Sequence, residues 1–183
     1  MKTTIRRGVF ETNSSSVHSI VIGNNGENIY RALPEVQYFG GGGFGWEVEQ
    51  YNDADTKAEY LWTGIVTLND EEDIDVDELR DSITDILGRH GIRAEFQEVG
   101  MIKSQYSDYE YFGFLENDDY CYIDHVYNLK DFVKLIATNE ELLMNYLYSN
   151  GSMIGTGNDN GYDNERGSVV LPKNVLLEYC KSN

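Results

Sequence analysis

The segment Asn69–Arg89, NDEEDIDVDELRDSITDILGR, constrains the fold more than any other part of this chain. Apolar residues recur in it at helical spacing and form one stripe: Val76, Leu79, Ile83, Ile86 and Leu87. At about 100° per residue, four carboxylates fall on nearly the opposite side. Asp75 is placed to cap the helix, with Glu78 three residues later. The sequence therefore predicts a helix with one face in a core and the other in water.

The four carboxylates on the outer face of this predicted helix have two interpretations. We name them the acidic stripe: Asp77, Glu78, Asp81 and Asp85. Like charges one turn apart destabilise a helix by about 0.2–0.5 kcal/mol per pair, so the stripe has an energetic cost. It is either a solvated face or a surface that imitates nucleic-acid phosphates and fits a groove lined by lysine and arginine. An acidic run directly before the helix extends the same charge: Asp70, Glu71, Glu72 and Asp73.

The net charge of the whole chain restricts its partners. The sequence has 32 acidic and 14 basic residues, which gives a formal net charge of −18. Such a protein does not bind nucleic acid or an anionic membrane by simple electrostatics, so we expect a basic partner instead. The first residues have no apolar run of the signal-peptide kind, and no stretch reaches 18 apolar residues. Two cysteines do not make a disulfide framework, and we expect a protein of a reducing cytoplasm.

Helical periodicity predicts four helices besides the acidic one. The first spans Asp53–Leu68, with Asp53 as its cap. Two shorter helices follow the capping residues Asn128 and Asn139, and a terminal helix starts at Leu171–Pro172. At 183 residues the chain is long enough for one domain with a real core.

The sequence predicts four strands: Val17–Ile22, Ile92–Val99, Tyr109–Leu115 and Tyr120–His125. In Ile92–Val99 apolar and polar residues alternate, as in a half-buried strand. The four glycines within Val36–Trp46 indicate a mobile loop that presents aromatics, or a wide turn between short strands. Gly151–Gly167 reads as a flexible loop. The predicted fold is therefore α+β: a single domain over residues 1–183 in which short antiparallel strands pack with about four to five helices.

A second acidic zone lies at Gln105–Asp124 and mixes carboxylates with tyrosines. We expect its two strands to be joined by a turn at Glu116–Asp119. Tyrosine beside carboxylate suits a protein surface that carries lysine and arginine, although an ordinary hairpin with packed aromatics fits the pattern as well. The residues of this zone that we expect in an interface are Asp108, Glu110, Asp118 and Asp119.

The N-terminal run RRGVFETNSSSVHSIVI resembles the start of a family of small proteins carried by phages and prophages of Firmicutes. The family pattern is Arg-x-Gly-Val-Phe-Glu-Thr-Asn-Ser-Ser-Ser-x-His-Ser, and it matches residues Arg6–Ser19 here. With its size and acidity the chain is also similar to type II-A anti-CRISPR proteins, which inhibit the RNA-guided nuclease Cas9. The resemblance implies kinship with these proteins and covers under a tenth of the chain.

These observations lead to one expected function and one alternative. We expect a phage-encoded anti-CRISPR protein, not an enzyme, that binds Cas9 with its guide RNA in the cytoplasm of the host bacterial cell. The acidic stripe, the acidic run and the second acidic zone would form the contact surfaces, with no direct binding of nucleic acid or membrane. The alternative is a phage enzyme or a nucleotide- or phosphate-binding protein whose site includes Arg6, Arg7, Ser14–Ser16 and His18.

Motifs for catalysis and for metal binding are missing from the sequence. There is no H-E-x-x-H, Walker or Rossmann pattern, and no G-x-S-x-G surrounds the serines. Cys121 and His125 are four residues apart in a predicted strand, about 13 Å, which is too far for one zinc ion. We therefore expect no cofactor and no metal site, with a loose calcium site at Asp159–Glu165 as an open alternative.

Overall fold

The computed structural model describes residues 16–24, 32–45, 49–71, 73–103, 110–115, 121–124, 129–158 and 174–180. Within these ranges four helices and ten strands form an α+β fold, as predicted. The helices are α1 (Ala54–Thr67), α2 (Val76–Arg89), α3 (Leu129–Thr138) and α4 (Glu140–Tyr148). The strands are β1 (Ser16–Asn24), β2 (Val36–Phe39), β3 (Gly43–Phe44), β4 (Glu49–Tyr51), β5 (Arg93–Phe96), β6 (Val99–Lys103), β7 (Glu110–Phe114), β8 (Tyr122–Ile123), β9 (Met153–Asn158) and β10 (Asn174–Cys180).

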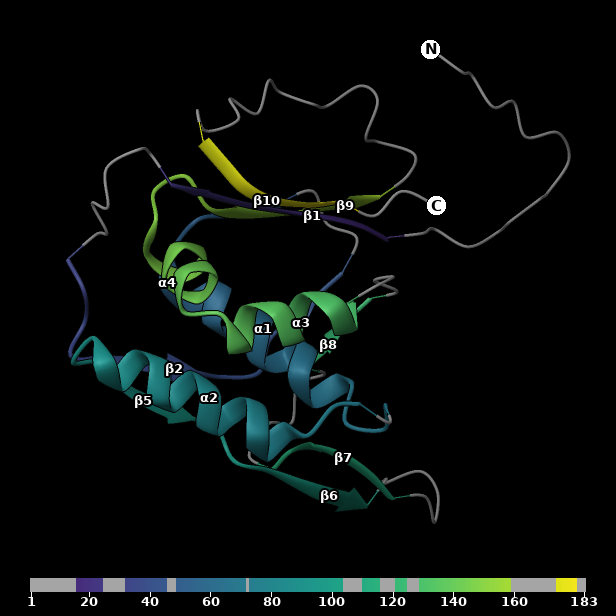
Figure 1. Cartoon of the computed structure of the whole chain (residues 1–183). Helices are drawn as coiled ribbons and strands as arrows, with labels where there is room; N and C mark the ends of the chain where they lie inside the picture. Colours follow the sequence, from purple (N-terminus) through teal and green to yellow (C-terminus); the bar gives the residue numbers. More distant parts are fainter. Residues whose placement is uncertain are drawn as a thin grey trace, which may run out of the picture.

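The largest sheet has four antiparallel strands in the order β10-β1-β9-β4. Figure 1 shows this sheet along the top of the molecule, with α1, α3 and α4 beneath it. Strand β1 attaches the sheet to the helices. Its side chains alternate between the two faces of the sheet, and Ile20 and Ile22, on the same face, are fully buried and belong to the same core as the helices. A bulge between Ile22 and Gly23 shifts the pairing of β1 with β10.

Helix α1 lies at the centre of the fold. Asp53 caps it and accepts a hydrogen bond from the backbone N–H of Thr56, as predicted. The sequence indicated one apolar face, but nearly every residue from Lys57 to Val66 is buried. The helix packs against β2, β7 and β8 and against all three other helices, so in its middle turns only Glu59 is partly exposed.

The glycine-rich segment forms a wide turn between short strands, one of the two predicted forms. Its flanking strands each join a partner in parallel: β2 pairs with β5, and β3 pairs with β8. Two backbone N–H groups of the turn are satisfied by side chains, since Gly41 donates to Gln97 Oε1 and Gly42 donates to Thr63 Oγ1. Phe44 is buried rather than presented to solvent.

Several sequence predictions of secondary structure were wrong. The C-terminal segment is the strand β10, not a helix, because it pairs with β1. The predicted strand Ile92–Val99 is divided between β5 and β6, which belong to different sheets. Part of the predicted loop Gly151–Gly167 is the strand β9. The two strands of the second acidic zone do not pair with each other, because β7 joins β6 and β8 joins β3. The expected turn at Glu116–Asp119 and the capping residue Asn128 lie outside the described residues.

Candidate partner-binding surface

Helix α2 has the two faces that the sequence predicts. Asp75 caps it by accepting a hydrogen bond from the backbone N–H of Glu78. All five residues of the apolar stripe are buried, and the helix packs against α3, β5, α1 and α4. After Arg89 the chain turns through Gly91, whose φ of 74° is in the left-handed region, and the N–H of Ile92 bonds back to the carbonyl of Leu87.

The acidic stripe is solvent-exposed over its whole length. The side chains of Asp77 and Asp81 are 78% and 77% exposed, and Glu78 and Asp85 are exposed as well. Successive members Asp77, Asp81 and Asp85 are four residues apart, so each is displaced from the next by about 6 Å along the helix axis. The stripe is therefore a row of carboxylates on a rigid, well-anchored element.

A basic residue beside the stripe, which the sequence analysis missed, reduces its repulsion. The guanidinium of Arg80 lies 2.9 Å from Asp77 Oδ1 and 3.8 Å from Asp81 Oδ1. The i, i+3 spacing of Asp77 and Arg80 was a signal for this ion pair. Both contacts are exposed, so they compete with water and leave the carboxylates accessible to a partner. The row has four negative charges beside one positive charge.

The acidic run before α2 is partly committed to contacts within the protein. Lys130, at the start of α3, places its Nζ 2.8 Å from Asp73 Oδ2 and 3.7 Å from Glu71 Oε2. The hydrogen bond from Lys130 lowers the pKa of Asp73, and that same bond raises the pKa of Lys130. Asp70 is exposed, and Glu72 lies outside the described residues.

Of the four predicted contact residues in the second acidic zone, the structure describes one, Glu110. Glu110 begins β7, opposite Lys103 of β6, and is exposed. The other predicted contact residues of the zone lie outside the described part of the chain: Asp108, Asp118 and Asp119. Among the predicted contact residues that are described, the structure thus brings together those of the acidic stripe on one helix face.

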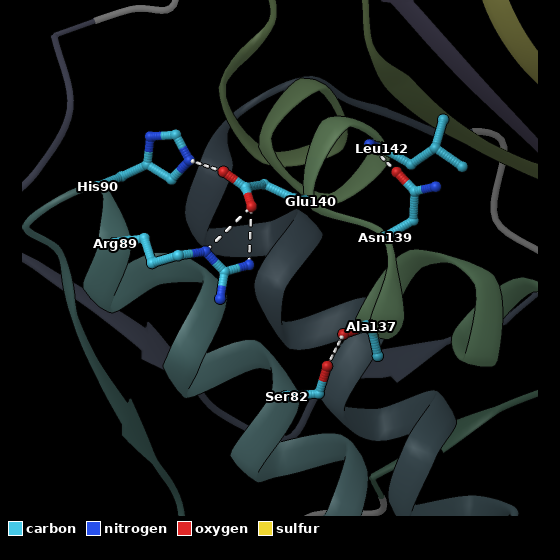
Figure 2. A network of polar contacts seen from close by, with 7 residues as sticks. All are labelled: Ser82, Arg89, His90, Ala137, Asn139, Glu140 and Leu142. Carbon is cyan, nitrogen blue, oxygen red and sulfur yellow. Dashed lines mark hydrogen bonds and ion pairs between the residues drawn. The ribbon is translucent and has the colours of Figure 1, made fainter.

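Polar contacts hold the C-terminal half of α2 against the next two helices (Figure 2). Glu140, at the start of α4, accepts hydrogen bonds from Arg89 at 2.7 and 3.0 Å, and its other oxygen lies 2.9 Å from His90 Nε2. Ser82 donates its hydroxyl to the carbonyl of Ala137. Asn139 caps α4, as predicted, by accepting from the N–H of Leu142. These contacts fix the direction in which the acidic stripe points.

The contact between α2 and α4 predicts a pH dependence of stability. Hydrogen bonds from Arg89 and then His90 lower the pKa of Glu140 below its ordinary value of 4.5. A lowered folded-state pKa adds stability that is fully present above the unfolded-state pKa and is lost as the pH falls through the folded-state pKa. We expect Glu140→Gln to lower the melting temperature at pH 7, and the difference from the native protein to shrink below about pH 4.5. A difference that stays constant from pH 7 to pH 3 would contradict this assignment.

The alternative site around the N-terminal motif has one described side chain, that of His18. It is fully buried in β1, with Nδ1 2.9 Å from the hydroxyl of Tyr60 and Nε2 3.0 Å from the carbonyl oxygen of Gly45. In a neutral ring Nε2 donates to the carbonyl and Nδ1 accepts from the hydroxyl. Both nitrogens therefore have partners inside the core. Ser16 belongs to β1, whereas Arg6, Arg7, Ser14 and Ser15 lie outside the described residues.

Metal ligands are not clustered in the part of the chain that the structure describes. There, no group of three His, Cys, Asp or Glu side chains is arranged to hold a metal ion. Cys121 is a half-buried cysteine near the glycine-rich turn. His125 and the predicted calcium segment Asp159–Glu165 lie outside the described residues.

Two further observations bear on the class of protein. No helix within the described ranges is long and apolar enough to cross a membrane. Comparison of the chain with models of protein families, with curated proteins and with solved structures finds no match.

Proposed function

We propose that this protein is a phage-encoded anti-CRISPR protein that inhibits a Cas9-type RNA-guided nuclease through its acidic surface. The observation that carries the proposal is the exposed acidic stripe on α2. An RNA-guided nuclease has positively charged channels for the heteroduplex and for the displaced strand, together with arginines that read the PAM. A rigid row of carboxylates is complementary to such a channel in charge.

Three further features support the same partner. The net charge of −18 disfavours nucleic acid itself as the ligand and favours a basic protein. Contacts from the following helices anchor α2, so little ordering entropy is lost when the stripe is bound. The choice of Cas9 among basic nucleic-acid enzymes comes from the N-terminal resemblance at Arg6–Ser19.

Charge reversal of the stripe tests the proposal. We expect Asp77→Lys, Asp81→Lys and Asp85→Lys together to weaken association with Cas9 and its guide RNA by at least about tenfold, because attraction becomes repulsion at the interface. The stripe is exposed, so the fold should tolerate the change, as thermal unfolding will check. Binding is measured at low and high salt, and DNA binding and DNA cleavage are assayed separately to show which step is inhibited.

A matched variant controls for net charge alone. Glu35→Lys, Asp131→Lys and Glu141→Lys change the charge by the same amount at exposed positions outside the stripe. We expect this variant to retain most of the inhibition, since long-range charge acts mainly on the association rate. Full inhibition by the stripe variant, or equal loss in both variants, would show that the stripe is not the contact surface.

A further inference from the structure

The β6–β7 hairpin exposes apolar side chains beyond its attachment to the core. Val99, Phe112 and Phe114 lie on one face and pack against the core. Met101 continues that face outward and is 62% exposed, the largest value among the exposed large hydrophobic side chains of the described residues. Figure 1 shows the hairpin at the lower end of the molecule, on the opposite side of the helices from the four-stranded sheet.

The opposite face of the hairpin is a flat apolar surface. Gly100 and Gly113 pair with each other at its centre. A Cβ atom on Gly100 would lie 3.3 Å from Leu115, and one on Gly113 would lie 3.2 Å from Ile102 and 3.3 Å from Tyr111. These three side chains therefore spread over the bare glycine backbone, and Leu115 and Tyr111 remain 50% and 44% exposed.

The register of the hairpin shows which backbone groups point outward. The N–H of Leu115 donates to the carbonyl of Glu98, so residues 98 and 115 form a hydrogen-bonded pair. In antiparallel strands hydrogen-bonded pairs alternate with non-hydrogen-bonded pairs, so the next hydrogen-bonded pair is Gly100 with Gly113. The N–H and C=O groups of Val99 and Met101 consequently point away from β7, toward the outer edge of β6. In the described ranges no strand pairs with that edge.

The net charge of the chain selects the kind of partner. Close to the edge three charged side chains are exposed: Glu98 at its start, Lys103 at its end, and Glu110 of β7, which pairs with Lys103 across the hairpin. A second copy of this chain would bring another net charge of −18 to the same place, which disfavours self-association. We propose that the outer edge of β6 accepts an extended segment of a basic protein as an added β-strand. Main-chain hydrogen bonds to Val99 and Met101 provide affinity, and lysine or arginine beside Glu98 provides selectivity. This interface is separate from the acidic stripe and independent of Cas9.

Synthetic peptides test the inference on the full chain. The probe is a blocked seven-residue peptide of alternating valine and lysine, and its matched control has glutamate in place of lysine. We expect saturable binding of the lysine peptide, at least about tenfold weaker binding of the glutamate peptide, and slowed hydrogen exchange of the Met101 amide in the complex. No binding of the lysine peptide, or equal binding of both peptides, would overturn the proposal.

Backbone substitutions separate strand addition from contact with side chains. Met101→Pro removes the outward N–H without removing a hydrogen bond to β7, so we expect loss of peptide binding, whereas Met101→Thr keeps that N–H and should still bind. Two peptides N-methylated on alternate residues provide a second measurement that does not depend on how the variant folds. Only one of them has its methyl groups facing β6, so one should lose binding and the other keep it. If both bind, or if Met101→Pro binds normally, the edge is not the site.

Discussion

Replacement of His18 by leucine should destabilise the protein by about 2–6 kcal/mol, although the new side chain is apolar and similar in volume. The imidazole connects the hydroxyl of Tyr60 with the carbonyl of Gly45, and it is fully buried. Leucine leaves both groups without this partner in a place that water does not reach, at a cost of about 1–3 kcal/mol each. Chemical denaturation of the purified variant measures the decrease in its free energy of unfolding.

A double-mutant cycle with Tyr60 separates this effect from a simple change of packing. Tyr60→Phe removes the hydroxyl that faces His18 Nδ1. When both residues are apolar, no hydroxyl remains to be satisfied, so the double variant should be more stable than the sum of the single changes predicts. If the two losses add, or if His18→Leu is as stable as the native protein, the hydrogen bond to Tyr60 is not what holds His18 in the core.

The second large effect is expected at the glycine-rich turn. A Cβ atom at Gly41 would lie 2.5 Å from the sulfur of Cys121 and 3.0 Å from the ring of Phe114. Both neighbours are packed in or against the core and have little room to move. We therefore expect Gly41→Ala to lower the free energy of unfolding by about 1–3 kcal/mol through overpacking, as chemical denaturation will measure.

Two further variants give this prediction a control and a rescue. Gly88→Ala, in α2, adds the same methyl group where nothing lies within 4 Å, and it should stabilise the helix by about 0.5–1 kcal/mol. In a Cys121→Ala background the cost of Gly41→Ala should fall, because the closest contact is gone. An equal cost in both backgrounds would locate the strain elsewhere in the turn.

The acidic helix was the part of the fold most open to prediction. Its cap at Asp75 and its buried stripe both depend on residues a few positions apart, and the structure agrees with each. The same locality explains the correct prediction of the caps Asp53 and Asn139. Arg80 was accessible to the same reasoning, because its partner Asp77 is three residues away. The contacts of Lys130 were not predictable in this way, because its partners Glu71 and Asp73 precede α2 and are distant from it in sequence.

Strand pairing could not be predicted from local patterns. A terminal helix was expected from Leu171–Pro172 onward, but β10 (Asn174–Cys180) lies in this segment and pairs with β1 from the other end of the chain. Isolated short apolar runs fit either state, and a partner strand decides between them. The two strands of the second acidic zone likewise find partners elsewhere, so their closeness in sequence was misleading.

The sequence by itself determined the α+β class, the acidic stripe and its separation from a buried face, because these follow from composition, helical period and capping. Only the tertiary structure decided which strands pair, that α1 is enclosed on all sides, and that His18 is a core residue with partners on both nitrogens. Those features depend on contacts between residues that are distant in sequence. The free energy of such contacts comes from burial and hydrogen bonding in the assembled fold, which no local pattern contains.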